Sequence, residues 1–238
     1  MKNEWTEEYI EKYLEYAVVR GREYLEAKIN ITCEDFNLAV IIDFAHENAL
    51  PLVIVNGSGY YSASDPRYDN FDDFKHQILK TTGVRDLQRE SNTVAVSPVV
   101  SPQPGDLIIN RNKSLVANHT QLISSVARGP NEGDQITVIS ILQGTGGHLD
   151  SDWARMFRIS GLLNVSDPHS AYYTGLPVQE AQYDVTGDFY VNFATDKRYT
   201  RFSAVAHPEF RSWNFYGWNP KTSAEPANLF DIRLYRGF

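Results

Sequence analysis

The N-terminal part of the chain carries two helical patterns of different character. Residues 3–28 place apolar side chains mostly three or four positions apart and fill the other positions with Glu, Lys and Arg, which predicts an amphipathic helix. Residues 33–48 are apolar nearly all round, and the pattern stops before Pro51. A helix without a polar face belongs in the interior of a protein. We therefore expect the second helix to lie in the core.

The middle of the chain contains turn-forming segments and one further helix. Residues 55–70 are rich in Gly, Ser, Asp and Tyr and predict a loop, whereas residues 71–81 have helical spacing. Three prolines and a glycine in residues 97–106 indicate a connection between regular elements.

The remaining sequence is dominated by segments typical of β-strands. β-Branched and aromatic residues are concentrated in segments 106–111, 119–127, 135–144, 188–195, 198–206 and 230–238. Residues 158–184 have no readable pattern and are interpreted as an insertion or a lid. The aromatic segment 210–220 favours core packing over a stacking surface for a sugar or peptide. Helices followed by antiparallel strands predict an α+β fold, with the helices against one face of a sheet.

Composition narrows the possible partners. The chain of 238 residues suits a single domain, 1–238. Its net charge of −8 argues against nucleic-acid binding, which requires a basic surface. No apolar run is long enough to cross a bilayer, so we expect no membrane insertion. The acidic, amphipathic start is unlike a signal peptide, so we expect a protein made in the cytoplasm.

The chain has a single cysteine, Cys33, which excludes an internal disulfide and a cysteine-based zinc site. Thr32 is a suitable N-cap and Asp35 completes a variant of the capping box, so Cys33 is predicted to be the first helical residue. The positive end of a helix dipole favours thiolate, the nucleophilic form, although Glu34 and Asp35 oppose this effect. A buried structural cysteine is the alternative interpretation.

Further motifs connect Cys33 to a known family. The chain contains "TCEDF" at the helix start, then "PGDLI" (104–108), "NHTQLI" (118–123) and "TVISILQGT" (137–145). In this order the motifs resemble the NlpC/P60-type papain-like cysteine peptidases and amidases. The acidic residues after Cys33 and the long segment before the histidine depart from the family pattern. The resemblance covers a core of about 8–145 and leaves 146–238 as an extension or lid of unassigned role.

The resemblance implies a role for each matching residue. Cys33 would be the nucleophile, His119 the general base, and Gln143 the polar residue that orients the imidazole. The backbone N–H of Cys33 and the hydroxyl of Tyr24 would hold the oxyanion. No cofactor is implied.

Other residues offer weaker candidates for the same roles. His46 and His148 are alternative bases, although His46 lies nearly four helical turns from Cys33. Asp106, which follows Pro-Gly, suits a structural turn. The remaining histidines are dispersed along the sequence without ligand-like spacing, so no metal site is predicted: His76, His169 and His207.

The resemblance implies a thiol hydrolase that cleaves an amide bond, with a peptide or peptidoglycan-like substrate cut as an endopeptidase or amidase. Without a signal peptide, such an enzyme would reach the cell wall or periplasm by a signal-independent route, as a delivered effector, a phage-type lysin or part of a larger exported protein. An acyltransferase or deamidase with the same dyad is an alternative. A non-catalytic interaction protein that retains a papain-like core is another. The sequence assigns no oligomeric state.

Overall fold

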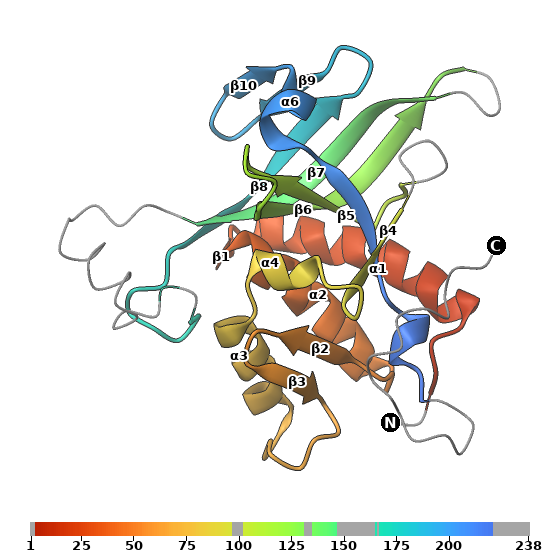
Figure 1. The fold of residues 1–238 in the computed structure, drawn as a ribbon, viewed down its shortest axis with the longest axis vertical. Coiled ribbons are helices and arrows are strands. Elements are labelled where there is room, and N and C mark those ends of the chain that lie inside the picture. Colours follow the sequence, from red (N-terminus) through yellow and green to blue (C-terminus); the bar gives the residue numbers. More distant parts are fainter. Residues whose placement is uncertain (1–2, 97–101, 131–134, 147–164, 166, 221–238) are drawn as a thin grey trace.

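The protein is a mixed α+β structure built around an antiparallel sheet (Figure 1). The computed structural model describes residues 3–96, 102–130, 135–146, 165 and 167–220. The strand order is β10-β9-β8-β7-β6-β5-β11-β4, and the short strand β1 pairs with β8. The strands are β1 (Asn30–Ile31), β4 (Thr93–Ala95), β5 (Leu107–Arg111), β6 (Ala117–Arg128), β7 (Ile136–Gly146), β8 (Gly175–Asp184), β9 (Phe189–Asn192), β10 (Lys197–Thr200) and β11 (Glu209–Trp213). The predicted α+β class is confirmed.

Both N-terminal helices form where the sequence predicts them and cover one face of the sheet (Figure 1). The helix α1 (Glu7–Glu26) is amphipathic, whereas nearly every residue of α2 (Cys33–Glu47) is buried. Gly21 lets α1 approach the sheet, because a Cβ atom there would lie 2.8 Å from the Leu142 side chain. The apolar helix α2 is therefore enclosed between α1, the sheet and the segments that follow it.

The two faces of the sheet carry separate apolar clusters, as strand alternation requires. Leu107, Leu122 and Leu142 point toward the helices and share a core with Phe36. The residues that follow or precede them point to the opposite face, where Ile108, Ile123 and Ile141 pack with aromatic residues of the C-terminal extension: Tyr183, Tyr190, Phe202 and Phe210. The extension thus covers the sheet face that the helices leave open.

Two predictions in the extension are wrong. Residues 158–184 were expected to form an insertion or lid, but Gly175–Asp184 is the strand β8, which pairs with β7 on one side and β9 on the other. Its Pro, Glu and Gln residues have low β propensity, so pairing with its neighbours decides its conformation. The second half of segment 198–206 forms the short helix α6 (Phe202–Ala206), because Arg201 adopts a left-handed conformation (φ 56°) that ends β10. The predicted strand 230–238 lies outside the described residues.

The region between α2 and β5 is more structured than the sequence indicates. The predicted loop 55–70 begins with a hairpin of β2 (Val53–Asn56) and β3 (Gly59–Ser62), whose turn uses Gly59 at φ 148°. The helix α3 (Phe71–Thr81) is confirmed, and Asn70 caps it by accepting a hydrogen bond from Asp73 N–H. The short helix α4 (Val84–Leu87) follows it.

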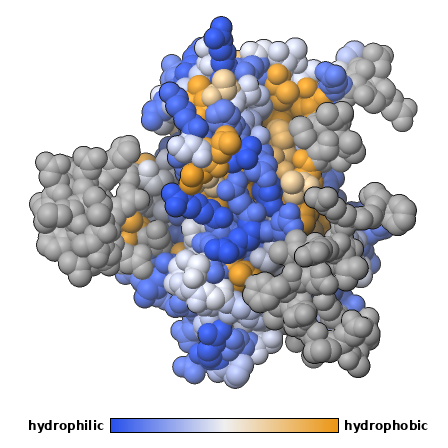
Figure 2. Space-filling view, viewed as in Figure 1, coloured by the Kyte–Doolittle hydropathy of each residue, from blue (hydrophilic) through white to orange (hydrophobic). Residues whose placement is uncertain are grey.

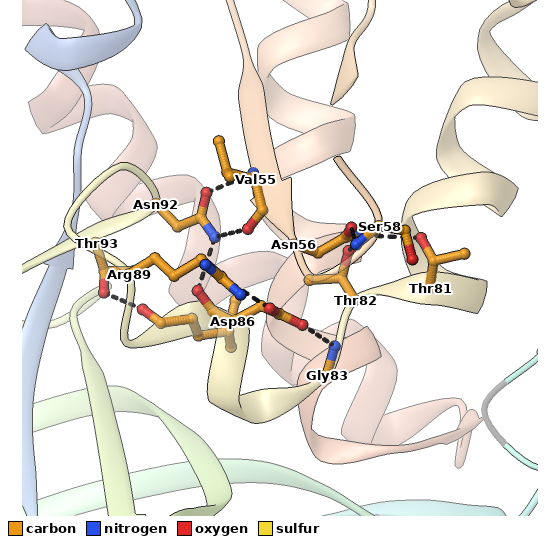
Figure 3. Close-up of polar contacts among 11 residues, drawn as sticks. Val55, Asn56, Ser58, Thr81, Thr82, Gly83, Asp86, Arg89, Asn92 and Thr93 are labelled. Atoms are coloured by element: carbon orange, nitrogen blue, oxygen red, sulfur yellow. Dashed lines mark hydrogen bonds and ion pairs between the residues drawn. The ribbon is translucent and has the colours of Figure 1, made fainter. Parts of the chain in front are cut away.

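A buried polar network holds this region together (Figure 3). The Asn92 side chain accepts from Val55 N–H at 2.8 Å and donates to the carbonyl oxygens of Val55 and Asp86 at 2.7 and 2.8 Å. Asn56 donates to the hydroxyls of Thr81 and Thr82 at the end of α3. These bonds tie β2, α3 and α4 to one another, and the same elements add Ile54, Ile78 and Leu87 to the main core.

Aromatic packing joins the two ends of the described chain. Trp5 contacts Phe215 and Trp218 with ring centroids 4.7 and 6.1 Å apart, and Trp213 donates its indole N–H to the Tyr13 hydroxyl. Trp218 belongs to the 3-10 helix η1 (Tyr216–Trp218). The core-packing interpretation of the aromatic segment 210–220 is confirmed, since Trp213, Phe215 and Trp218 are buried.

The surface is mainly hydrophilic over the helical half of the view in Figure 2, and hydrophobic residues reach the surface mainly over the sheet in the upper half. Within the described part of the chain, no helix combines the length and apolarity needed to cross a membrane.

Candidate functional site

The site lies where β6 and β7 separate. Their ladder ends at the pair Leu122↔Leu142, beyond which β6 pairs only with β5 and β7 only with β8. The start of α2 meets the sheet at this opening, because a Cβ atom on Gly144 would collide with the carbonyl oxygen of Thr32. The strand ends that carry His119 and Gln143 and the helix start that carries Cys33 therefore converge.

Cys33 is the first residue of α2, as predicted, and only 7% of it is exposed. Its thiol donates a hydrogen bond to Glu34 Oε2 at 3.0 Å. Burial and the neighbouring Glu34 carboxylate raise the pKa of the thiol well above its usual value, although the backbone N–H groups of Thr120 and Glu34 act in the opposite direction. The helix start alone therefore does not produce a thiolate, and Cys33 is a neutral thiol in this arrangement.

His119 and Gln143 are joined directly: His119 Nε2 lies 2.8 Å from Gln143 Oε1. The same Gln143 oxygen accepts from the Gln121 amide at 2.6 Å and from the Tyr190 hydroxyl at 3.2 Å. Asn110 donates to Gln121 Oε1 at 3.1 Å, which fixes the orientation of the Gln121 amide. Gln143 is therefore a triple acceptor with its oxygen toward His119.

This contact determines the hydrogen-bonding state of the imidazole. A nitrogen that faces a carbonyl oxygen must donate, so Nε2 carries the proton and Nδ1 is the acceptor of the neutral ring. Burial lowers the pKa of His119, while the bond to Gln143 and the charge of Glu34 act to raise it. A neutral imidazole with a free Nδ1 is the form that can remove a proton from a thiol.

The structure brings His119 and Gln143 together but leaves Cys33 bonded to Glu34. Among the described residues, no hydrogen bond joins the Cys33 thiol to His119. The thiol instead lies near the backbone of Thr120, the residue that follows His119 in β6. The thiol of α2 thus lies beside the strand that carries the base, and direct proton transfer requires the thiol to leave Glu34.

A tyrosine occupies the start of α2, but it is not Tyr24. Tyr24 lies on α1 and packs against Phe36 with ring centroids 5.7 Å apart. The hydroxyl of Tyr173 accepts from Thr32 N–H at 2.9 Å and donates to Asp35 Oδ2 at 2.8 Å. Because Tyr173 precedes β8 and lies far from Cys33 in sequence, no local motif could have identified it.

Asp35 does not form the predicted capping box. Thr32 occupies the N-cap position, but its side chain makes no capping hydrogen bond, and the Asp35 carboxyl faces Tyr173 instead. Asp35 is fully buried, and burial together with the nearby Glu34 raises the pKa of its carboxyl to about 8. The start of α2 therefore contains two buried acids, a thiol and a carboxyl, that are protonated near neutral pH.

A cavity of about 450 Å³ opens beside this network and is lined by His119, Gln121 and Gln143. The C-terminal extension supplies its other wall through Tyr190, Lys197 and Phe202, among others. Within the described residues, the lining contains no Asp or Glu and one lysine. The cavity is therefore rich in amide groups and has a positive rim on an otherwise acidic protein.

The remaining candidates are placed elsewhere. His46 lies at the opposite end of α2, where its ring stacks on Phe71 with centroids 3.6 Å apart. His148 lies outside the described residues. Asp106 accepts from Gln103 N–H at 3.1 Å, in agreement with a turn role. His76 and His169 are far apart in sequence, but the fold brings them together, with ring centroids 3.8 Å apart.

Comparison with known proteins finds no matching family model, curated protein or solved structure. The resemblance to the NlpC/P60 group therefore stays a prediction that rests on the motifs and on the geometry of the site.

Proposed function

We propose that the protein is a papain-like thiol hydrolase that cleaves an amide bond, with Cys33 as nucleophile, His119 as general base and Gln143 as orienting residue. The observation that carries this proposal is the 2.8 Å bond between His119 Nε2 and Gln143 Oε1 beside the start of α2. It leaves Nδ1 as the acceptor, which is the tautomer that a thiol–imidazole pair needs.

The reaction follows from these positions. His119 Nδ1 takes the thiol proton while Cys33 Sγ attacks the substrate carbonyl carbon, and the imidazolium then protonates the leaving amine. Water next attacks the thioester, gives its proton to His119, and releases the carboxylic acid and the thiol. Backbone N–H groups at the start of α2 are the donors available for the oxyanion.

Activation of Cys33 requires its thiol to exchange Glu34 for His119 as its hydrogen-bond partner. Cys33 donates to Glu34 in the described conformation. The thiol would have to leave Glu34 and reach the His119 ring through the opening between β6 and β7, because His119 points to the sheet face opposite α2. Because the pKa of the thiol is raised and that of the imidazole is lowered, we expect a resting neutral pair and a proton transfer that accompanies attack.

The substrate expected for this site is a peptide, and cell-wall peptide is the leading candidate. The exposed side-chain amide of Asn118 in the cavity can pair with peptide groups, and Lys197 can pair with a substrate carboxylate. We expect amidation of that carboxylate to raise KM, and Lys197→Gln to remove the difference between free and amidated substrates.

Purified peptidoglycan provides the direct test. Wild-type protein should release soluble peptides detectable by mass spectrometry, whereas Cys33→Ala and His119→Ala should release none above background. Cys33→Ala is the matched control because it removes only the sulfur. Equal release by wild type and Cys33→Ala would exclude the proposed nucleophile.

A non-catalytic role is favoured by one observation, the bond that holds the thiol on Glu34. Iodoacetamide alkylation as a function of pH separates the two functions. A catalytic His119 should make alkylation of wild type faster at neutral pH than that of His119→Ala. Identical pH profiles, with a thiol pKa at or above the ordinary value of about 8.5, would contradict the enzyme.

A further inference from the structure

A second cluster of ligand-type side chains lies on α3 and on the segment that precedes β8. His76 comes from α3, whereas Asp167 and His169 come from a segment about ninety residues later in sequence. One ligand atom from each of the three residues lies within 4.8 Å of those of the other two. His76 Nε2 and Asp167 Oδ1 are 2.7 Å apart, and the two imidazole rings are stacked.

We propose that His76, Asp167 and His169 form a binding site for a divalent transition-metal ion of the zinc type. Two imidazoles and one carboxylate are a common three-residue donor set for Zn²⁺, with bonds of roughly 2.0–2.2 Å and an open fourth position. Ligation would require the two imidazole rings to leave their stacked arrangement, so that one nitrogen of each points at the ion beside Asp167. Imidazole ligands favour zinc, copper or nickel over magnesium and calcium, which prefer oxygen.

The surroundings of Asp167 support ligation. Its Oδ1 faces His76 and the backbone N–H of His169, while Oδ2 faces the partly exposed Lys80 ammonium at 3.6 Å. Both oxygens of this carboxylate thus face donors or a cation. Lys80 has a flexible stem that can turn away and leave Oδ2 to an ion.

An ion at this position would also act on the start of α2. Asp167 and His169 begin the segment that leads to Tyr173, and Tyr173 holds Thr32 N–H and Asp35 through its hydroxyl. A metal bridge to His76 would fix this segment to α3. The ion would thereby stabilise the position of Tyr173 against the helix that begins with Cys33. The site itself does not depend on the proposed hydrolase.

The test is zinc binding by tag-free protein in a Cys33→Ala background, because a thiol is itself a zinc ligand. After removal of metals with a chelator, isothermal titration with Zn²⁺ should give one equivalent per chain, and the melting temperature should rise. His76→Ala and His169→Ala should each weaken binding at least tenfold. The exposed His46, remote from the cluster, provides the control: His46→Ala should bind as the parent does. Magnesium at the same concentration should produce no shift.

Three outcomes would overturn the site. These are binding below about half an equivalent, an affinity that His76→Ala and His169→Ala leave unchanged, or equal responses to Zn²⁺ and Mg²⁺. In any of them the cluster is an ion pair with a stacked histidine and nothing more. Because His169 is exposed, His169→Ala is expected to fold, and circular dichroism verifies that loss of binding is not loss of structure.

Discussion

Two polar clusters inside this protein differ in how many of their buried donors and acceptors have hydrogen-bond partners. In the network around Asn92 (Figure 3), each donor and acceptor of that side chain has a backbone partner at 2.7 or 2.8 Å. At the start of α2, buried oxygen atoms of Thr32, Asp35 and Asn37 make no hydrogen bond within the described residues. Native proteins pair almost all buried polar groups, so the second cluster departs from this rule, as do a few buried atoms elsewhere in the described residues, such as Asn110 Oδ1.

The difference separates a structural role from a functional one. A satisfied network stabilises the fold and has no capacity left for a ligand. Around Cys33, by contrast, the thiol and the Asp35 carboxyl have strongly raised pKa values because they are buried beside Glu34. Perturbed titration is typical of functional sites. The comparison predicts that changes in the first cluster affect stability, and changes near the second affect reactivity.

The largest expected effect is on stability. Asn92→Ala leaves the backbone N–H and carbonyl of Val55 without partners and removes one of two bonds to the Asp86 carbonyl, so we expect the free energy of unfolding to fall by about 3 kcal/mol. Urea denaturation measures it. Asn118→Ala, at an exposed position, should change stability by less than about 0.5 kcal/mol. A loss below about 1 kcal/mol for Asn92→Ala would mean that the network is not a structural clamp.

The next effect is on catalysis. Gln143→Ala removes the acceptor that holds the His119 tautomer, so kcat for peptide release should fall on the order of 100-fold. Gln179→Ala is the control, since Gln179 lines the same cavity and bonds Asn192 instead of His119. Equal losses of kcat in the two variants would remove the orienting role of Gln143.

Local signals explain which parts of the site could be predicted from the sequence. The start of α2 at Cys33 follows from Thr32 and the apolar run behind it, and both features lie within a few residues of each other. His119 and Gln143 could be paired in advance because neighbouring antiparallel strands place their ends together. Gln121 was missed although the period of two puts it on the same face as His119, so alternation could have identified it.

The residues that could not be predicted are brought in by long-range topology. Tyr173 and Tyr190 reach the site only because β8 and β9 extend the sheet, and β8 itself has no strand-like composition. Asp167 meets His76 across about ninety residues for the same reason. No spacing rule in one sequence encodes such encounters. The hairpin at 53–62 was missed for another reason, because its Gly, Ser and Tyr residues are equally typical of a loop.

A smaller effect concerns the thiol itself. Glu34→Gln removes the charge that, after burial, contributes most to the raised pKa of Cys33. We expect the thiol pKa to fall, and iodoacetamide alkylation at pH 7 to accelerate about tenfold for each pKa unit. Glu47→Gln, at the other end of α2, should leave the rate unchanged. Slower alkylation in Glu34→Gln would indicate that Glu34 instead assists removal of the thiol proton.

The last prediction is a pH dependence of stability from Asp35. Its pKa is about 8 in the folded protein against 3.8 for an ordinary aspartate, so the native state binds more protons than the unfolded state between these values. Stability from this group is therefore complete below about pH 4 and is lost as the pH rises toward 8, with a slope of about 1 kcal/mol per pH unit.

Asp35→Asn keeps an acceptor for Tyr173 and cannot ionise, so its unfolding free energy should decline less between pH 5 and pH 8. Urea unfolding at several pH values measures both slopes, with Asp72→Asn, at an exposed position of α3, as the control that should retain the wild-type slope. Parallel curves for wild type and Asp35→Asn would show that Asp35 is ionised in the folded protein, and the start of α2 would then resemble the satisfied cluster more than the reactive one.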